Sequence, residues 1–212
     1  PTDPDTGEAT HFPSGGWEMN YYADGVPAGF YRFEIDNVGF SLWMMSIHAG
    51  YHESPARYLR ERWPAIELAA DLLVRWRDAD TGLHAPAQED DRADFTQTLH
   101  GAITTFGSLD MAARAARFIG KDDQANRWET RAEEVRAAII DQFYLEDERR
   151  FESESGNNWN PGSTSNGPTG WMIWPFTLLP TDDEKMRQQL IHDTESITPA
   201  LELTADGGAY FM

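Results

Sequence analysis

The chain has 212 residues, of which 17 are basic and 36 are acidic, so its formal net charge is -19. The length suits one large domain, and a hydrophobic content of 40% with 8 tryptophans can build a substantial core. The charge argues against nucleic acid and anionic membranes as partners, because both bind to positive patches. The absence of cysteine excludes disulfides and thiolate sites.

The start of the chain carries no targeting signal. It begins at Pro1 without an initiator methionine or a basic and apolar leader. No apolar run approaches the roughly 18 residues of a membrane span. We therefore expect a soluble protein that is processed or excerpted from a longer sequence. Secreted and cytoplasmic locations both remain open.

Residues 1–37 predict a loop-rich entry segment, because they are rich in Gly, Pro, Asp and aromatic residues. Two short extended stretches are expected within it, at 17–22 and 29–35, separated by a turn at Asp24-Gly25. Residues 38–212 are expected to form one helical domain. Its first helix spans 38–51, where apolar residues recur at helical spacing.

Three longer helices follow in the predicted order. Ser54-Pro55 begins a helix that continues to residue 77, and Pro64 is expected to kink or restart it. The segments 95–119 and 122–143 keep a helical apolar spacing and are separated only by a short link containing Gly120. These two helices should therefore form an antiparallel hairpin.

The last third of the chain begins with a polar loop. Residues 152–170 (ESESGNNWNPGSTSNGPTG) are too long for a simple connector, and two further helices are predicted at 171–179 and 181–191. No strand alternates with these helices, which argues against a parallel sheet. The succession of antiparallel helix hairpins predicts an all-α fold, arranged as part of a toroid of paired helices.

An acidic triplet, Glu89-Asp90-Asp91, lies between the turn at 80–82 and the predicted helix at 95–119. A carboxyl cluster on a loop before a helix is where an all-helical glycosidase would hold its proton donor. The alternative is a solvated acidic turn that favours the start of the next helix through the helix dipole. Both interpretations remain open from the residues alone.

Several stretches resemble the glucoamylase family of inverting glycoside hydrolases. They are 31–36 (YRFEID), 62–64 (RWP), 81–83 (TGL), 89–91 (EDD) and 95–96 (FT). The resemblance covers roughly residues 31–120 and implies part of an (α/α)6 toroid, a barrel of six inner and six outer helices. It also implies a terminal sugar, glucose from an α-glucan or oligosaccharide, as the product of an acid/base mechanism.

The resemblance also assigns candidate residues. The family's proton donor lies in a Trp-Glu-Glu motif, which matches Gln88-Glu89-Asp90, so Glu89 is the candidate general acid and Asp90 a substrate-binding neighbour. Asp36 occupies the place of an aspartate near the sugar, although a helix N-cap before Val38 is an alternative role. The tryptophan of the motif is absent here.

Two further residues are candidates for substrate binding. Arg32 alternates with Glu34 on one face of the expected extended stretch, and an ion pair between the two is the alternative. Trp159 lies in the polar loop, where an exposed indole invites a ligand. The family's Trp-x-Arg-Asp segment and its general base have no counterpart in this chain. The missing base makes an inactive carbohydrate-binding or scaffold module an alternative, as are a trehalase-like hydrolase and a disaccharide phosphorylase.

No metal or cofactor is expected. The histidines are scattered without the spacing of a ligand set, and no glycine-rich nucleotide motif is present. The expected partners are an oligosaccharide or polysaccharide substrate and, because half a toroid leaves apolar helix faces uncovered, the missing half of the barrel.

Overall fold

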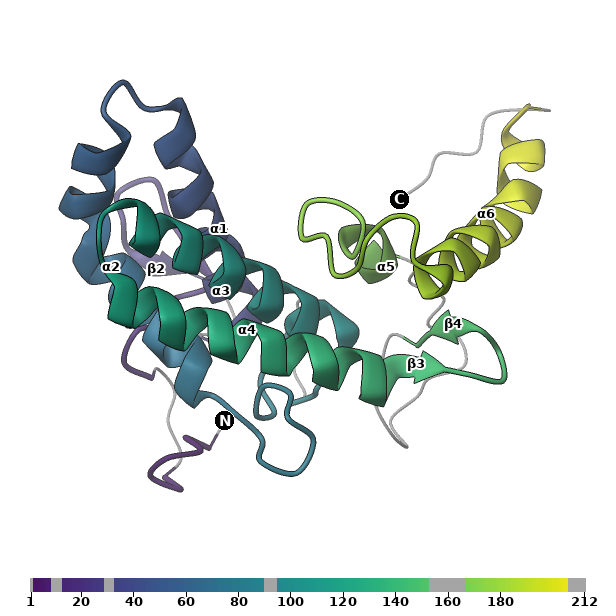
Figure 1. Cartoon of the computed structure of the whole chain (residues 1–212), viewed down its shortest axis with the longest axis horizontal. Coiled ribbons are helices and arrows are strands. Elements are labelled where there is room, and N and C mark those ends of the chain that lie inside the picture. Colours follow the sequence, from purple (N-terminus) through teal and green to yellow (C-terminus); the bar gives the residue numbers. More distant parts are fainter. Residues whose placement is uncertain (1, 9–12, 29–32, 90–94, 153–166, 206–212) are drawn as a thin grey trace.

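The computed structural model describes residues 2–8, 13–28, 33–89, 95–152 and 167–205. These ranges are mostly helical (Figure 1), which confirms the all-α expectation. The helices are α1 (Ile35–His48), η1 (Ala49–Tyr51), α2 (Pro55–Arg75), α3 (Leu99–Phe118), α4 (Asp122–Phe143), α5 (Gly167–Trp171) and α6 (Glu184–Ala205). Two short antiparallel pairs join β1 (Asn20–Tyr21) to β2 (Pro27–Ala28), and β3 (Tyr144–Leu145) to β4 (Arg150–Phe151).

The predicted hairpin of the third and fourth helices is confirmed. Figure 1 shows α3 and α4 side by side, joined by a short link in which Gly120 adopts a φ of 79°. Lys121 N–H returns to the carbonyl of Ala116, which closes the end of α3. The helix begins at Leu99 rather than at residue 95, because the Thr98 side chain accepts the N–H groups of His100 and Gly101 as an N-cap.

The N-terminal half of α3 lies at the centre of the core. Every residue from Leu99 to Leu109 is buried, and α3 packs against α1, α2 and α4. Glycines let neighbouring segments approach α3 closely. A Cβ added at Gly107 would overlap the ring of Phe176, and one at Gly39 of α1 would lie 3.1 Å from the carbonyl oxygen of Thr104. Polar groups at this end of α3 are therefore shielded from water.

Other expectations for the helices also differ from the structure. Helix α2 continues through Pro64 without a restart, since the buried residues on both sides of Pro64 keep their helical packing. The short helix expected at 171–179 is absent, because α5 ends at Trp171 and Pro175, which lacks an N–H, disfavours helix there. Helix α6 begins at Glu184, after Asp183 accepts the N–H of Lys185.

The entry segment is loop-rich in its described part. The expected extended stretch at 29–35 is described only from Phe33, and α1 already begins at Ile35. Residues 29–32 lie outside the described ranges. Among the helices of the described ranges, none combines the length and the apolar character needed to cross a membrane.

Candidate functional site

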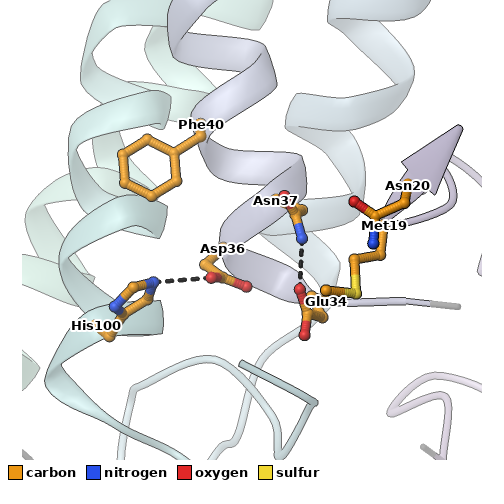
Figure 2. A pocket seen from close by; sticks show the side chains of 7 residues that line it. All are labelled: Met19, Asn20, Glu34, Asp36, Asn37, Phe40 and His100. Atoms are coloured by element: carbon orange, nitrogen blue, oxygen red, sulfur yellow. Dashed lines mark hydrogen bonds and ion pairs between the residues drawn. The ribbon is translucent and has the colours of Figure 1, made fainter. Parts of the chain in front are cut away.

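An open pocket of about 250 Å³ lies beside the first turns of α1 and α3. Its lining residues, drawn in Figure 2, are Met19, Asn20, Glu34, Asp36, Asn37, Phe40 and His100. The Asp36 carboxylate lies 2.8 Å from His100 Nε2, and Asn37 Nδ2 donates to Glu34 Oε2 at 2.5 Å. Two carboxylates, two amides and an imidazole beside an aromatic ring suit a ligand that carries hydroxyl groups.

Local pairing of two loops positions this pocket. Glu34 forms a parallel bridge with Gln88, and the N–H of Ile35 donates to the Gln88 carbonyl at 3.1 Å. Glu34 is extended and occupies the N-cap position of α1, so the N-cap role considered for Asp36 is wrong. Asp36 lies in the first helical turn, and Phe40 follows it on the same helix face.

Aromatic rings connect two lining residues of the pocket, Phe40 and His100, with Trp171 of α5. The ring centroid of Trp171 lies 4.7 Å from that of Phe40 and 4.4 Å from that of His100. Sequence patterns do not group these three rings, because they come from three separate helices. The only local signal was the spacing of four residues between Asp36 and Phe40.

Glu89 lies under the start of α3 and is fully buried. Its Oε2 accepts the hydroxyl of Thr98 and, at 2.8 Å, the N–H of Gly101, while its Oε1 accepts the N–H of Thr98 at 3.2 Å. On the remaining side, His84 Nε2 lies 3.3 Å from Oε1. Four groups from two segments therefore enclose this carboxyl.

The enclosure shifts the pKa values of both buried groups. Burial raises the pKa of Glu89 from its ordinary 4.5 to about 8, the nearby Asp36 charge adds to the rise, and the hydrogen bonds from Thr98 and Gly101 oppose it. Burial lowers the pKa of His84 from 6.5 to about 4, against the opposing effect of the Ala85 carbonyl. At neutral pH both side chains are therefore uncharged.

These shifts predict a pH dependence of stability. From pH 4.5 to 8 the folded chain keeps a proton on Glu89 that the unfolded chain has lost, so stability falls as pH rises. From pH 4 to 6.5 the unfolded chain protonates His84 and the folded chain does not, so stability rises with pH.

The two effects cancel between pH 4.5 and 6.5, and only the Glu89 effect acts from 6.5 to 8. We expect the free energy of unfolding to fall by about 2 kcal/mol across that upper window, because a difference of one bound proton changes it by about 1.4 kcal/mol per pH unit. Urea titrations at several pH values measure it. A Glu89→Gln variant should lack the fall, and an identical fall in that variant would contradict the assignment.

Gly101 gives a second test of the enclosure. A Cβ at this position would lie 2.8 Å from His84 Nε2 and closer still to the Glu89 carboxyl. We expect Gly101→Ala to lower the free energy of unfolding by about 1–3 kcal/mol, because the atoms around the carboxyl leave no room for an added methyl group. Denaturant titration measures this loss. Gly50→Ala, whose Cβ would meet nothing within 4 Å, is the matched control. Equal stability of the two variants would contradict the tight enclosure.

The structure brings Asp36 and Glu89 into contact with the same first turn of α3. His100 contacts Asp36, and its neighbours Thr98 and Gly101 hold Glu89. Glu89 does not line the open pocket. The other candidates, Arg32, Asp90 and Trp159, lie outside the described residues.

Sequence reasoning missed six of the seven lining residues: Met19, Asn20, Glu34, Asn37, Phe40 and His100. Their signal is weak in sequence, because His100 meets Asp36 only through the packing of α3 on α1. Within the described part of the chain, no group of three or more histidine, aspartate or glutamate side chains could hold a metal ion.

Comparison with known proteins gives one informative similarity. No known family profile matches the chain. The chain is 30% identical over 195 residues to a protein of Methanocaldococcus jannaschii named as an uncharacterized glycosyl hydrolase. The match covers 91% of this chain and 29% of that protein, so the chain spans less than a third of its relative's length. The similarity therefore extends along nearly all of this chain.

Proposed function

We propose that this chain is part of a glucoamylase-like glycoside hydrolase that releases a terminal sugar, glucose from an α-glucan or oligosaccharide. The observation that carries the proposal is the open pocket around Asp36 and His100, in a chain similar to a protein named glycosyl hydrolase. Carboxylates beside an aromatic ring are suited to holding a sugar ring by its hydroxyls and its apolar face.

In this proposal Glu89 is the proton donor of an inverting reaction. A donor must be protonated at the working pH, and burial raises the pKa of Glu89 to about 8. A donor must also come within about 3 Å of the leaving oxygen, so the carboxyl has to leave its enclosure when substrate binds. Asp36, Asp90, Arg32 and Trp159 are the proposed sugar contacts.

The second carboxylate of the mechanism is assigned to another part of the protein. An inverting enzyme needs a general base roughly 6.5–9.5 Å from the acid, across the scissile bond, to activate water. We propose that further helix hairpins complete an (α/α)6 toroid and supply this base. Exposed apolar side chains support such packing: Met44 on α1, and Leu190 and Ile191 on α6.

Asp36→Asn tests the sugar site directly. We expect kcat/KM for maltose or soluble starch to fall about 10- to 100-fold in the intact protein, since a charged hydrogen bond contributes about 1.5–3 kcal/mol. Glucose release is the measurement, and Asp147→Asn, at an exposed position outside the pocket, is the matched control. Equal activity of the two variants would remove Asp36 from the site.

The enclosure of Glu89 favours a second candidate, a carbohydrate-binding module without activity. A buried carboxyl with three hydrogen bonds is suited to holding the start of α3 without taking part in a reaction. Calorimetry with maltooligosaccharides separates the two: binding that depends on Asp36 without sugar release supports the module. Release that requires added inorganic phosphate would instead indicate a disaccharide phosphorylase.

A further inference from the structure

We propose that His84 and Glu89 share one proton in the folded protein, and that His84 is the positioning residue that keeps Glu89 in its acid form. Neither side chain has any exposed surface. The pair is formed by residues of this chain and does not depend on the proposed function. Its use in catalysis rests on the proposed glycosidase function.

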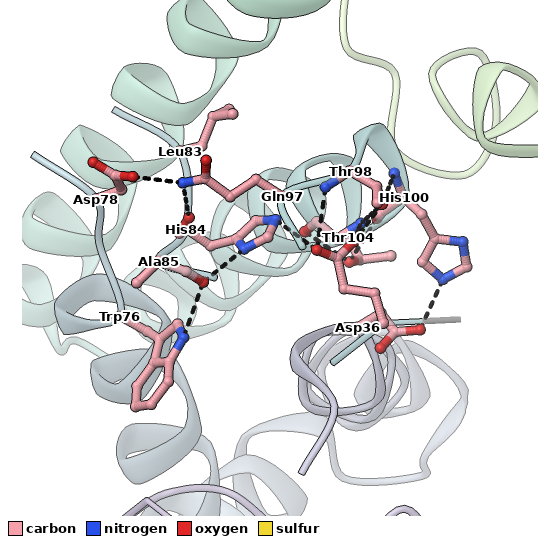
Figure 3. Close-up of polar contacts among 12 residues, drawn as sticks. Asp36, Trp76, Asp78, Leu83, His84, Ala85, Gln97, Thr98, His100 and Thr104 are labelled. Carbon is pink, nitrogen blue, oxygen red and sulfur yellow. Dashed lines mark hydrogen bonds and ion pairs between the residues drawn. The ribbon is translucent and has the colours of Figure 1, made fainter. Parts of the chain in front are cut away.

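The orientation of the imidazole fixes which atom carries its proton. His84 Nδ1 lies 3.0 Å from the carbonyl oxygen of Ala85, and a carbonyl can only accept, so Nδ1 is the donor. Figure 3 shows His84 and the Trp76 indole directed at this same carbonyl; the Trp76 bond is 3.1 Å long. In the neutral ring Nε2 therefore presents a lone pair.

That lone pair faces Glu89. His84 Nε2 lies 3.3 Å from Oε1 and has no well-aligned hydrogen bond among the described residues, and the Thr98 carbonyl, which also acts on the ring, raises the pKa of His84 only against the larger effect of burial. An ionised carboxyl would set two acceptors against each other inside a dry core, which leaves both unsatisfied. A proton between Oε1 and Nε2 resolves this, and burial of both groups favours the neutral form with the proton on Glu89.

The surrounding charges also act on the pair. Asp36 on α1, whose partner is His100 on α3, disfavours a negative charge on Glu89 but favours a positive charge on His84. Arg131 on α4 disfavours a positive charge on His84. Its guanidinium donates to the carbonyls of Gly82 at 2.9 Å and Leu83 at 3.0 Å, which also fixes the loop that carries His84.

The pair gives the proposed acid a means of recovering its proton. Transfer of the proton from Oε1 to a leaving oxygen would leave a carboxylate, and on its return to the enclosure that carboxylate would face the Nε2 lone pair. This arrangement is disfavoured, so Glu89 takes up a proton from solvent before or as it returns. His84 itself never touches the substrate.

Infrared titration of the intact protein tests the shared proton. We expect a protonated-carboxyl band at pH 6.5 that is absent in Glu89→Gln. His84→Phe removes the acceptor and should lower the pKa read from this band by about one unit, the equivalent of one hydrogen bond. His84→Gln, whose amide oxygen can accept, should restore most of the shift, and His48→Gln at an exposed histidine should change nothing.

Absence of a Glu89-dependent band at pH 6.5 would overturn the proposal, and so would an unchanged titration in His84→Phe. Should the His84 variants not fold, the comparison of the unaltered protein with Glu89→Gln still decides whether the proton is present. A Glu89-dependent band without any sugar release would support the shared proton and contradict the glycosidase function. Sugar release without such a band would contradict the shared proton and support the glycosidase function.

Discussion

Glu89→Gln is expected to lower kcat for α-glucan hydrolysis at least about 100-fold, because general acid catalysis contributes typically 10²- to 10⁴-fold. The same change should leave the free energy of unfolding at pH 6.5 within about 1 kcal/mol of the unaltered protein, the size of one net hydrogen bond. A loss of turnover without a loss of stability is the combination that separates a proton donor from a structural carboxyl.

Stability is expected to survive because glutamine matches the protonated form of Glu89. Its amide oxygen can accept from the Thr98 hydroxyl and the Gly101 N–H, and its NH2 group can donate to His84 Nε2, while the Thr98 N–H loses its acceptor. Glutamine cannot donate a proton to a leaving oxygen. An aryl glucoside with a good leaving group needs little protonation, so the loss of rate should be smaller with that substrate.

Steady-state assays with maltooligosaccharide and aryl glucoside, together with urea titration, measure both effects. Glu53→Gln, at an exposed position between η1 and α2, is the matched control. Full activity in Glu89→Gln would mean that Glu89 is not the acid. A large loss of stability at pH 6.5 would mean that Glu89 is ionised in the folded protein.

Trp76→Ala is expected to have the largest effect on folding, about 3–5 kcal/mol. The Trp76 ring is fully buried and packs edge-on against Phe33, with ring centroids 5.1 Å apart. Its indole N–H donates to the Ala85 carbonyl at 3.1 Å, and the N–H of Ala85 donates to the Trp76 carbonyl at 3.0 Å. Trp76 thus anchors the segment that carries His84 towards Glu89.

Two variants make the Trp76 result interpretable. Trp76→Phe keeps most of the volume but removes the donor, so its loss should be smaller than that of Trp76→Ala and should isolate the bond to Ala85. Trp174→Ala removes an indole that is 74% exposed and should cost little. Thermal or urea unfolding measures all three. Similar stability of the Trp76 and Trp174 variants would contradict the role of Trp76 as an anchor.

The helix hairpins were predictable because their apolar residues repeat with the period of a helix. That signal is local, and it located α1, α2, α3 and α4 to within a few residues. Its errors arose where side chains or proline override periodicity, as with the Thr98 cap at the start of α3 and Pro175 after α5.

The site was predictable only in part. Asp36 and Glu89 were found through a family resemblance, and Asp36 does line the pocket. The burial of Glu89 was not predictable, because it depends on bridges between distant segments: Glu34 with Gln88, and Ala87 with Thr96. The raised pKa of Glu89 has the same origin, because burial is its largest cause.

The most direct test of the proposed function is a proton NMR time course of the intact protein with a maltooligosaccharide. We expect release of glucose with inverted, β, anomeric configuration at the start of the reaction, before mutarotation mixes the anomers. Release of α-glucose would contradict the inverting mechanism with Glu89 as its acid. Binding of the sugar without any release would contradict the glycosidase function and leave the carbohydrate-binding module in its place.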